Sequence, residues 1–368
     1  MRKWSDIRPS KFTISSRSDR MYCSPTPELS SIVKEDVNNI IAKCGGEIGS
    51  LDGSTVLITG STGFLAREIT ESLLRSKANG LDIKMVLTSR KPSKVHEVFG
   101  DRLGAGIDII PIDEMDRYPD HVDHIIHAAS PCDPRLNNAS PFKTMLEISS
   151  MTQKAIMLGM RNDLKRFVLL SSGAVYGIQP PELRCISEDH TGAPDIRQAA
   201  SCYGEAKRYS ELILLASGLP YTILRGFSFI GPNQDLSSSF AVPDFINSGF
   251  KEHRIVINGD GRPVRSFCYE SDFAVMLLKS LVHAKNQTLN AGNDRPEISI
   301  MELANIIADR IGGVKVLING ATTSEGLPPR YVPNIDRMRG IFVPEVDIGA
   351  GIDRIVKHIR ETRSNDLL

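Results

Sequence analysis

Tyr203 and Lys207 are the two residues whose types and spacing most directly suggest acid–base chemistry. They lie four positions apart at the start of a predicted helix, so their side chains share one face of it. A tyrosine, with an ordinary pKa of about 10, is a poor acid or base at neutral pH, but a nearby lysine ammonium favours its phenolate form. The pair matches the proton transfer of alcohol–ketone interconversion. An exposed pair on an ordinary helix would have the same spacing, so the neighbouring segments decide the interpretation.

Ser172 follows a predicted strand over residues 166–171, within the segment Leu-Ser-Ser-Gly-Ala-Val-Tyr-Gly at 170–177. Hydroxyls that follow a parallel strand emerge at the carboxyl edge of the sheet, where ligands bind. We therefore expect Ser172 to hydrogen-bond the reacting oxygen beside Tyr203. A serine that only caps the loop is the alternative.

A glycine turn between a strand and a helix lies in residues 55–69. The apolar run Val56–Ile58 predicts a strand that is buried on both faces. Gly60, Gly63 and Ala66 follow at the spacing of a dinucleotide fingerprint: a tight turn, close backbone approach to a pyrophosphate, and close helix–sheet packing. The helix N-terminus then offers free N–H groups to the phosphates. The alternative is an ordinary strand-to-helix turn.

The end of the second predicted strand, Thr88-Ser89-Arg90-Lys91, discriminates between cofactors. NAD-binding proteins usually place an acid there to hold the ribose hydroxyls, and an acid repels the additional phosphate of NADP. Here two cations and a hydroxyl stand instead, and they can bind a phosphate. We therefore expect Ser89, Arg90 and Lys91 to select NADP, with NAD as the possible alternative. A solvated basic turn is the other interpretation of this segment.

The bulk properties favour a globular protein of the reducing cytoplasm. The formal net charge is +0, so no global charge predicts a nucleic acid or a membrane surface as partner. No apolar stretch approaches the ~20 residues of a membrane-spanning helix, and the start Met-Arg-Lys-Trp-Ser-Asp lacks the apolar core of a secretory signal. Six cysteines without a C-x-x-C pair indicate reduced thiols. We expect no metal site, because His124 and His127 lie in a predicted strand.

A first helix is predicted at 29–43, and strands and helices alternate after it. This alternation predicts an α/β fold, a Rossmann-type doubly wound parallel sheet with a smaller C-terminal α/β lobe. The expected strands end near residues 59, 88, 111, 127, 171 and 225, and the expected helices include 142–161, 203–217, 242–250, 271–282, 299–312 and 352–363. We divide the chain into a flexible N-terminal arm (1–28), an N-terminal helix and linker (29–50), an NAD(P)-binding Rossmann domain (51–225) and a substrate-binding lobe (226–368). The arm is either a disordered tail or an oligomer contact.

Together these segments resemble the extended short-chain dehydrogenase/reductase family of NAD(P)-dependent epimerases, dehydratases and decarboxylases of nucleotide sugars. The resemblance spans residues 51 to 365. It rests on the glycine loop, His127-Ala128-Ala129-Ser130, Ser171-Ser172 with Val175-Tyr176-Gly177, Tyr203 with Lys207, Leu224-Arg225 through Gly231-Pro232, and Gly259-Asp260-Gly261 with Arg265.

The resemblance implies a role for each segment. Ser172, Tyr203 and Lys207 are the expected catalytic triad, and the last two also contact the cofactor. Further cofactor contacts are expected from Gly60, Ser61, Thr62, Gly63, Phe64, Leu65, Asp113 (facing the adenine), Ala128, Ala129 and Ser130. Substrate contacts are expected from Ser130, Ser172, Gly173, Ser228 and, for the diphosphate, Arg265. Family members often dimerise through two helices, which implies a homodimer formed by helices 142–161 and 203–217.

Departures from the family pattern narrow the reaction. Dehydratases and decarboxylases carry an acid just after the position of Ser172, whereas this chain has Gly173-Ala174, although residues 200–208 and 127–131 resemble the decarboxylase branch locally. The Asn usual after Leu224-Arg225 is replaced by Ser228. The expected NADP favours reduction of a keto sugar over epimerisation with retained NAD(P), decarboxylation or dehydration. An NADP-binding sensor without turnover is the non-enzymatic alternative.

Overall fold

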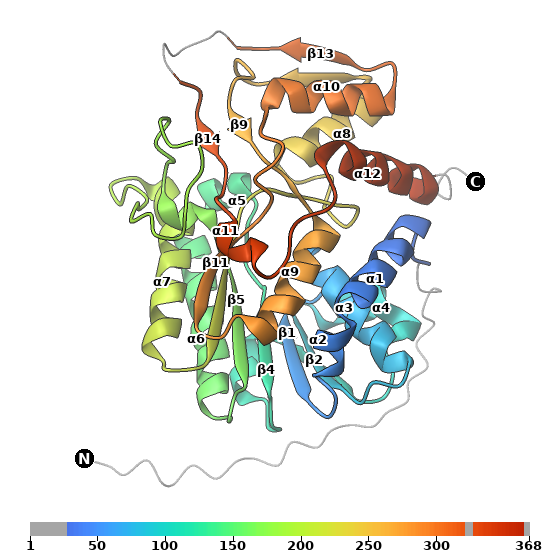
Figure 1. Cartoon of the computed structure of the whole chain (residues 1–368), viewed down its shortest axis with the longest axis vertical. Helices are drawn as coiled ribbons and strands as arrows, with labels where there is room; N and C mark the ends of the chain where they lie inside the picture. The colour runs from blue at the N-terminus through green and yellow to red at the C-terminus, as the bar shows by residue number, and fades with distance from the viewer. Residues whose placement is uncertain (1–27, 321–326, 364–368) are drawn as a thin grey trace.

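The computed structural model describes residues 28–320 and 327–363. Figure 1 shows a central sheet covered by helices on both faces, with a smaller lobe beyond one edge of the sheet. Residues 1–27, nearly all of the expected flexible arm, lie outside the described residues.

The central sheet has seven strands in the order β11-β6-β5-β4-β1-β2-β3, and all of their pairings are parallel. The strands are β1 (Thr55–Thr59), β2 (Lys84–Ser89), β3 (Ile107–Pro111), β4 (His124–His127), β5 (Arg166–Ser172), β6 (Tyr221–Gly226) and β11 (Gln287–Ala291). The chain runs outward from β1 to β3 and restarts on the other side of β1 with β4. Such a reversal leaves a crevice that binds ligands in sheets of this type. The expected doubly wound fold is confirmed.

Helices pack on both faces of this sheet. One face is covered by α1 (Ser31–Lys43), α2 (Gly45–Gly49), α3 (Phe64–Ala78), α4 (Pro92–Phe99) and α9 (Glu270–His283), and the other by α6 (Pro141–Met160) and α7 (Cys202–Ala216). Val56 and Ile58 point into the first core and Leu57 into the second. Successive side chains of a strand point to opposite faces, so burial on both faces explains why the whole run is apolar.

The chain returns to the central sheet after the lobe has begun, which corrects the expected domain boundary at residue 225. β11 pairs with β6, with Leu289 opposite Leu224, and Phe273 of α9 packs in the same core as these two residues. The run Gln-Thr-Leu-Asn-Ala is too short and mixed to distinguish a strand of the large sheet from one of the lobe. The part of the chain that builds the central sheet and its core therefore includes residues 270–291.

The smaller lobe is built from the segments on either side of this return. Its elements are β7 (Phe229–Ile230), α8 (Ala241–Glu252), β8 (Arg254–Ile257), β9 (Val264–Arg265), β10 (Cys268–Tyr269), β12 (Ile298–Ser299), α10 (Ile300–Ile311), β13 (Lys315–Ile318), β14 (Arg330–Tyr331) and α12 (Ile348–Arg363). The short helix α11 (Asp336–Arg339) packs instead against β11 of the central sheet, and Met338 lies in the core of that sheet. It has its own apolar core, which includes Phe245, Leu303 and Ile355. The capping box expected at the start of α10 is confirmed, because the Glu302 N–H donates to the Ser299 hydroxyl at 3.1 Å and the Ser299 N–H donates to the Glu302 carboxylate at 2.7 Å.

Helix α1 joins the central sheet and its helices to the lobe. Arg354 of α12 donates to Asp36 at 2.7 Å and to Glu35 at 2.8 Å. The Tyr269 hydroxyl of β10 also donates to Asp36 at 2.7 Å. The Asp36 carboxylate is buried, whereas the Glu35 side chain is 62% exposed. The first described helix therefore packs against α3 and α9 and also holds the last one in place.

Candidate active site

The carboxyl ends of β1, β2, β4 and β5 meet at one edge of the sheet, because these strands are parallel and paired in register. The strands end at Thr59, Ser89, His127 and Ser172. The segments that the sequence predicts to be functional begin where these strands end, so they all lie at this one edge of the sheet. The candidate site is formed there, at the side of the sheet that faces the lobe.

The glycine loop has the geometry of a phosphate cradle. Gly60 has a φ of +65°, and a Cβ on it would lie 2.9 Å from the Cα of Ala129, so both the turn and the close approach to the β4 loop require glycine. Ala66 is buried. Gly63 is the N-cap of α3, and no side chain caps this helix start. The exposed first N–H groups of α3 therefore fit a dinucleotide pyrophosphate. Ser61, Thr62, Phe64 and Leu65 lie in the same turn.

Thr59 and His127 tie the glycine loop to the β4 loop. The Thr59 hydroxyl contacts His127 Nδ1 at 2.9 Å and accepts from the Ala129 N–H at 3.0 Å. This contact fixes the backbone of Ala128, Ala129 and Ser130 beside Gly60. Burial lowers the pKa of His127 to about 3, so the ring is neutral. No group of three or more His, Cys, Asp or Glu within residues 28–320 and 327–363 is arranged to hold a metal ion.

The expected NADP-selecting residues lie one strand away from the glycine loop. Ser89 is buried at the end of β2, and its hydroxyl accepts from the Lys91 N–H at 3.2 Å. The Arg90 side chain is 74% exposed, and its nearest ion-pair contact, with Glu147, is 3.8 Å long. Asp113 follows β3, and its carboxylate is exposed. The guanidinium of Arg90 is therefore accessible at the position expected for a ribose phosphate.

Ser172 and Tyr203 meet although 31 residues separate them in the sequence. Ser172 is the last residue of β5, Tyr203 is the second residue of α7, and the Ser172 hydroxyl lies close enough to Tyr203 to influence its pKa. The Ser172 Oγ also accepts from the Ala174 N–H at 3.1 Å. Burial raises the pKa of Tyr203 above its ordinary value, and the nearby Ser172 hydroxyl opposes this shift. In the ligand-free chain Tyr203 is therefore a neutral phenol that can donate a proton.

Lys207 lies one turn further along α7 and is buried. Its Nζ lies 6.0 Å from the centre of the Tyr203 ring. Burial lowers the pKa of Lys207 to about 8, while the nearby Glu211 carboxylate acts in the opposite direction. The structure thus brings the three expected catalytic side chains together.

The expected substrate residues line the lobe side of this triad. Gly173 directly follows Ser172, and a Cβ on it would lie 2.8 Å from the Phe227 ring. The half-buried Arg265 on β9 donates to the Val264 carbonyl at 2.8 Å, and burial lowers its pKa. The Ser228 carbonyl accepts from the Cys268 N–H at 2.9 Å. Ser130 remains half-exposed beside the glycine loop.

Three further residues at this site had no sequence signal. The Tyr331 hydroxyl of β14 lies beside Gly173, 2.6 Å from where a Cβ on that glycine would be, and Phe227 packs against the Tyr331 ring with 4.7 Å between ring centres. Cys132 lies close enough to Tyr203 and Lys207 to affect the pKa of both, and its side chain is exposed toward solvent. Tyr331 is positioned by the pairing of two strands of the lobe, and the local sequence pattern cannot predict such a pairing.

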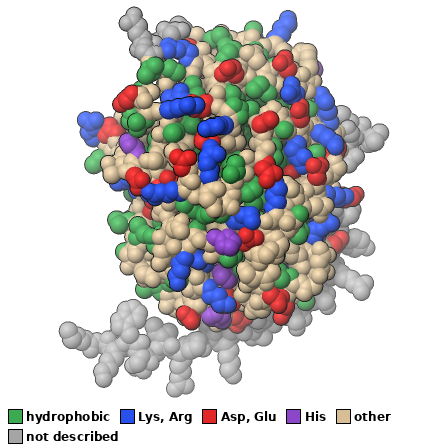
Figure 2. Space-filling model, viewed as in Figure 1, with side chains coloured by type: hydrophobic (Ala, Val, Ile, Leu, Met, Phe, Trp, Pro, Cys, Tyr) green, Lys and Arg blue, Asp and Glu red, His purple; other side chains and the backbone are tan. Residues whose placement is uncertain are grey.

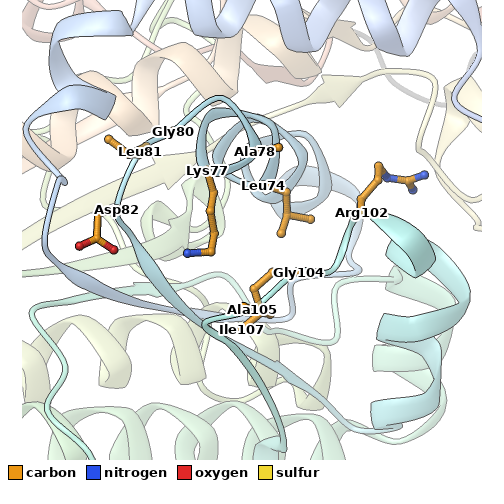
Figure 3. A pocket seen from close by; sticks show the side chains of 10 residues that line it. All are labelled: Leu74, Lys77, Ala78, Gly80, Leu81, Asp82, Arg102, Gly104, Ala105 and Ile107. Atoms are coloured by element: carbon orange, nitrogen blue, oxygen red, sulfur yellow. The ribbon is translucent and has the colours of Figure 1, made fainter.

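A hollow of about 440 Å³ lies elsewhere, between the end of α3 and the starts of β2 and β3 (Figure 3). Its two cations already have partners: Lys77 donates to the Ile83 carbonyl at 2.6 Å, and Arg102 pairs with Glu71 at 2.9 Å. This hollow lies at the amino ends of the strands, away from the triad. Figure 2 shows Lys and Arg side chains interspersed with Asp and Glu over one face of the molecule. None of the helices in residues 28–320 and 327–363 is long and apolar enough to cross a membrane.

The fold is of the Rossmann type, and Ser172, Tyr203 and Lys207 lie at the same edge of the sheet as the glycine loop. The model of the NAD dependent epimerase/dehydratase family matches residues 56–292, and the chain belongs to this family. This confirms the expected membership of the nucleotide-sugar-modifying branch of extended short-chain dehydrogenases/reductases, and that the chain is an enzyme.

Individual relatives are more distant. UDP-glucuronic acid decarboxylase 1 of Xenopus tropicalis is 26% identical over 84% of this chain and 73% of its own length. A UDP-N-acetylglucosamine 4-epimerase of Methanobrevibacter ruminantium, solved with UDP-N-acetylmuramic acid, has a TM-score of 0.73 and 24% identity over 84% of this chain and 99% of its own. A UDP-glucuronic acid 4-epimerase of Bacillus cereus, solved with UDP-glucuronic acid and NAD, has a TM-score of 0.70 and 21% identity over 84% and 99%. The two solved structures share the fold of this chain.

Proposed function

We propose that the chain is an NADP-dependent oxidoreductase of nucleotide sugars that reduces a keto sugar. The observation that carries this proposal is the position of Tyr203 beside the buried Lys207 on α7, with Ser172 near enough to influence the pKa of Tyr203. A neutral Tyr203 suits reduction, because a carbonyl oxygen must receive a proton as the carbon is reduced. NADPH, when bound, supplies the hydride.

Residues of the chain transfer the proton, orient the substrate and bind the cofactor. Tyr203 donates the proton to the substrate oxygen, and Ser172 holds that oxygen by a hydrogen bond. Lys207 holds the cofactor ribose, and its charge favours the phenolate that remains on Tyr203 after the transfer. Arg265, which is half-buried and donates to the Val264 backbone carbonyl, binds the substrate diphosphate.

The preference for NADP is supported by the exposed Arg90 guanidinium beside Ser89 and Lys91. NAD remains the alternative cofactor, since the family is described as NAD dependent and the Bacillus cereus epimerase was solved with NAD. Direct measurement of both dissociation constants decides between the two cofactors.

Epimerisation is the second candidate, because the solved structures that share this fold include sugar-nucleotide 4-epimerases. Decarboxylation is suggested by the decarboxylase relatives, but the positions after Ser172 hold Gly173 and Ala174 where the sequence resemblance leads us to look for an acid. All three reactions share the proton transfer by Tyr203, and they differ in whether the reduced cofactor is consumed.

One assay separates these reactions. The purified chain is incubated with NADPH and nucleotide 4-keto sugars, and in parallel with intact nucleotide sugars including UDP-glucuronate, while reduced nicotinamide, epimers and CO₂ are followed. Loss of NADPH with a keto sugar is the expected result. An epimer without loss of NADPH, or release of CO₂, would replace the reductase proposal. Tyr203→Phe should abolish turnover and leave cofactor affinity nearly unchanged; substantial residual turnover would contradict the triad.

We also propose a homodimer and a cytoplasmic location. Large apolar side chains are exposed on the outer faces of α6 and α7, among them Phe142 (77%), Met157 (58%) and Leu212 (64%). Contiguous exposed apolar surface of this kind typically marks an interface. The five cysteines of the described residues are all free, which suits a reducing compartment. Light scattering and cell fractionation test these two proposals.

A further inference from the structure

Two consecutive residues of β5 bind two residues of α7 that are one helical turn apart. The Leu170 carbonyl accepts from the Lys207 Nζ at 2.8 Å. The next residue, Ser171, donates its hydroxyl proton to the Glu211 carboxylate at 2.5 Å. Residues four apart on a helix share one face, so both contacts lie on the side of α7 that covers β5. The helix is thus bound to the strand at two points directly before Ser172.

Arg225 of β6 holds the Glu211 carboxylate in this position. It is paired with Ser171 across the two strands, and paired residues of neighbouring strands point to the same face of the sheet. Its Nη2 donates to Glu211 at 2.7 Å and its Nε at 3.1 Å. The Glu211 side chain is only 8% exposed. A buried carboxylate is stable only where it is paired and hydrogen-bonded, so Ser171 and Arg225 together fix its place.

The Arg225 guanidinium also reaches the turn that follows Ser172. Its Nη1 donates to the Tyr176 hydroxyl at 2.9 Å, and the guanidinium carbon lies 4.8 Å from the centre of the Tyr176 ring. The Tyr176 hydroxyl in turn donates to the Asn290 side chain on β11 at 2.7 Å. One buried ion pair therefore connects α7 with the end of β5, the turn that contains Tyr176, and two further strands of the sheet.

The second contact point fixes the direction of α7. A contact at one point leaves a helix free to pivot about it, whereas two contacts one turn apart prevent the pivot. Tyr203 lies one turn before Lys207 on this helix, and Ser172 directly follows the contact point on the strand. A pivot of α7 would therefore change the distance between Tyr203 and Ser172. A misplacement of about 1 Å can lower a reaction rate about 100-fold.

We propose that Glu211 is a positioning residue that fixes α7 on β5 and so sets the distance between Tyr203 and Ser172. Its carboxylate acts through its contacts with the sheet and takes no part in proton or hydride transfer. Without these contacts, the turn of α7 that carries Lys207 moves more freely, and the Lys207 bond to β5 opens more often. The effect on turnover rests on the proposed function, whereas the effect on the Lys207 bond does not.

Acylation of Lys207 tests these contacts without turnover. Ser171→Ala removes the hydroxyl donor and leaves the Glu211–Arg225 pair in place, and Glu211→Gln removes the charge. Each full chain is treated with a trace of acetic anhydride over a range of pH, and the acetylated Lys207 peptide is quantified by mass spectrometry. Because the buried Lys207 must leave the Leu170 carbonyl to react, the alkaline plateau of the rate reports how often this bond opens. We expect the plateau to rise at least about fivefold in both variants.

Glu71→Gln is the matched control. Glu71 is a buried carboxylate on α3, outside the site, and accepts from Arg102 at 2.9 Å and 3.0 Å. Its substitution should lower stability without changing the plateau for Lys207. Ser171→Ala carries the test where Glu211→Gln folds poorly, because it keeps the buried ion pair. An unchanged plateau in folded Ser171→Ala, or an equal rise in Glu71→Gln, would overturn the proposal.

Turnover provides the second measurement. In Ser171→Ala and Glu211→Gln we expect kcat to fall at least about 10-fold, with KM for sugar and cofactor within about threefold of the wild-type values. In Ser171→Ala the alkaline fall of activity should stay at the same pH, because the Glu211 charge remains. An unchanged kcat in the folded variants, or a shift of this alkaline fall in Ser171→Ala, would also overturn the proposal. If the wild-type chain turns over no nucleotide sugar, the proposed function fails, and the acylation of Lys207 still decides the role of Glu211.

Discussion

The Lys207 ammonium donates a 2.8 Å hydrogen bond to the carbonyl oxygen of Leu170, on the strand that ends two residues later at Ser172. This bond joins α7 to β5 at the catalytic edge and fixes a buried cation near the Tyr203 ring. Burial of the ammonium lowers the pKa of Lys207 to about 8. Lys207 is therefore charged below this pH and neutral above it.

Activity should depend on pH through Lys207. The charge that favours the Tyr203 phenolate is lost as the pH rises through about 8, so kcat/KM for the cofactor should fall about 10-fold per pH unit above that value. Lys207→Arg keeps a cation at this position, and any activity it retains should lack this alkaline fall. A flat wild-type profile well above pH 8, measured with saturating sugar, would contradict the assignment.

Arg90 should control the choice between cofactors. We expect Arg90→Ala to weaken NADP binding about 10-fold, because a charge-assisted hydrogen bond to the phosphate is lost, and to leave NAD binding within about twofold. Lys143→Ala is a matched control: Lys143 is also 74% exposed and also contacts Glu147, at 3.7 Å, but it lies on α6. Calorimetry with both nucleotides measures the difference. Equal loss of NADP and NAD affinity would argue against phosphate recognition by Arg90.

Gly60 and Gly53 allow a comparison of strain with steric clash. Both have positive φ values, +65° and +71°, but an added Cβ meets Ala129 at 2.9 Å in the first and nothing within 4 Å in the second. Gly53→Ala should cost about 1 kcal/mol of unfolding free energy from the backbone alone. Gly60→Ala should cost more and also weaken cofactor binding at least about 10-fold. Urea unfolding and cofactor titration measure both effects, and equal costs at the two sites would rule out the clash.

The buried ion pair between α1 and α12 should stabilise the whole molecule. Asp36→Ala leaves the Tyr269 hydroxyl and Arg354 without their shared buried partner, and should cost about 3 kcal/mol of unfolding free energy. Glu35→Ala removes the exposed partner of the same Arg354 and should cost at most about 1 kcal/mol. Denaturant unfolding of the two variants gives the comparison. A cost for Asp36→Ala no larger than that for Glu35→Ala would show that burial adds nothing here.

A charge on the exposed α6 face should disrupt the proposed dimer. Met157→Glu places a carboxylate in apolar surface that would become buried, so we expect a monomer in light scattering. Leu317→Glu is the control, since Leu317 is 46% exposed on β13 in the lobe. A monomeric wild type, or a Met157→Glu variant that remains dimeric, would reject α6 as the interface.

The sequence predicts the parts of the site that follow from local geometry. Parallel strands bring Thr59, Ser89 and Ser172 to one edge, and the four-residue spacing puts Tyr203 and Lys207 on one helix face. It cannot predict Tyr331, whose position depends on the pairing of β14 with β9 after a long excursion through the lobe. The first expected helix, 29–43, is confirmed as α1, whereas the short helix α2 that follows it was not predicted from the sequence.

The place of β11 in the sheet also sets an order of assembly during synthesis. β11 is the edge strand beside β6, yet it is made only after residues 227–269 of the lobe. Until residue 291 has left the ribosome, β6 has an unpaired edge. The apolar residues of β6 and β5 are likewise not buried until α9 packs on them. The cofactor domain and the first half of the lobe therefore cannot mature one after the other. They must fold as interlaced segments of one chain, with α12 closing the molecule last.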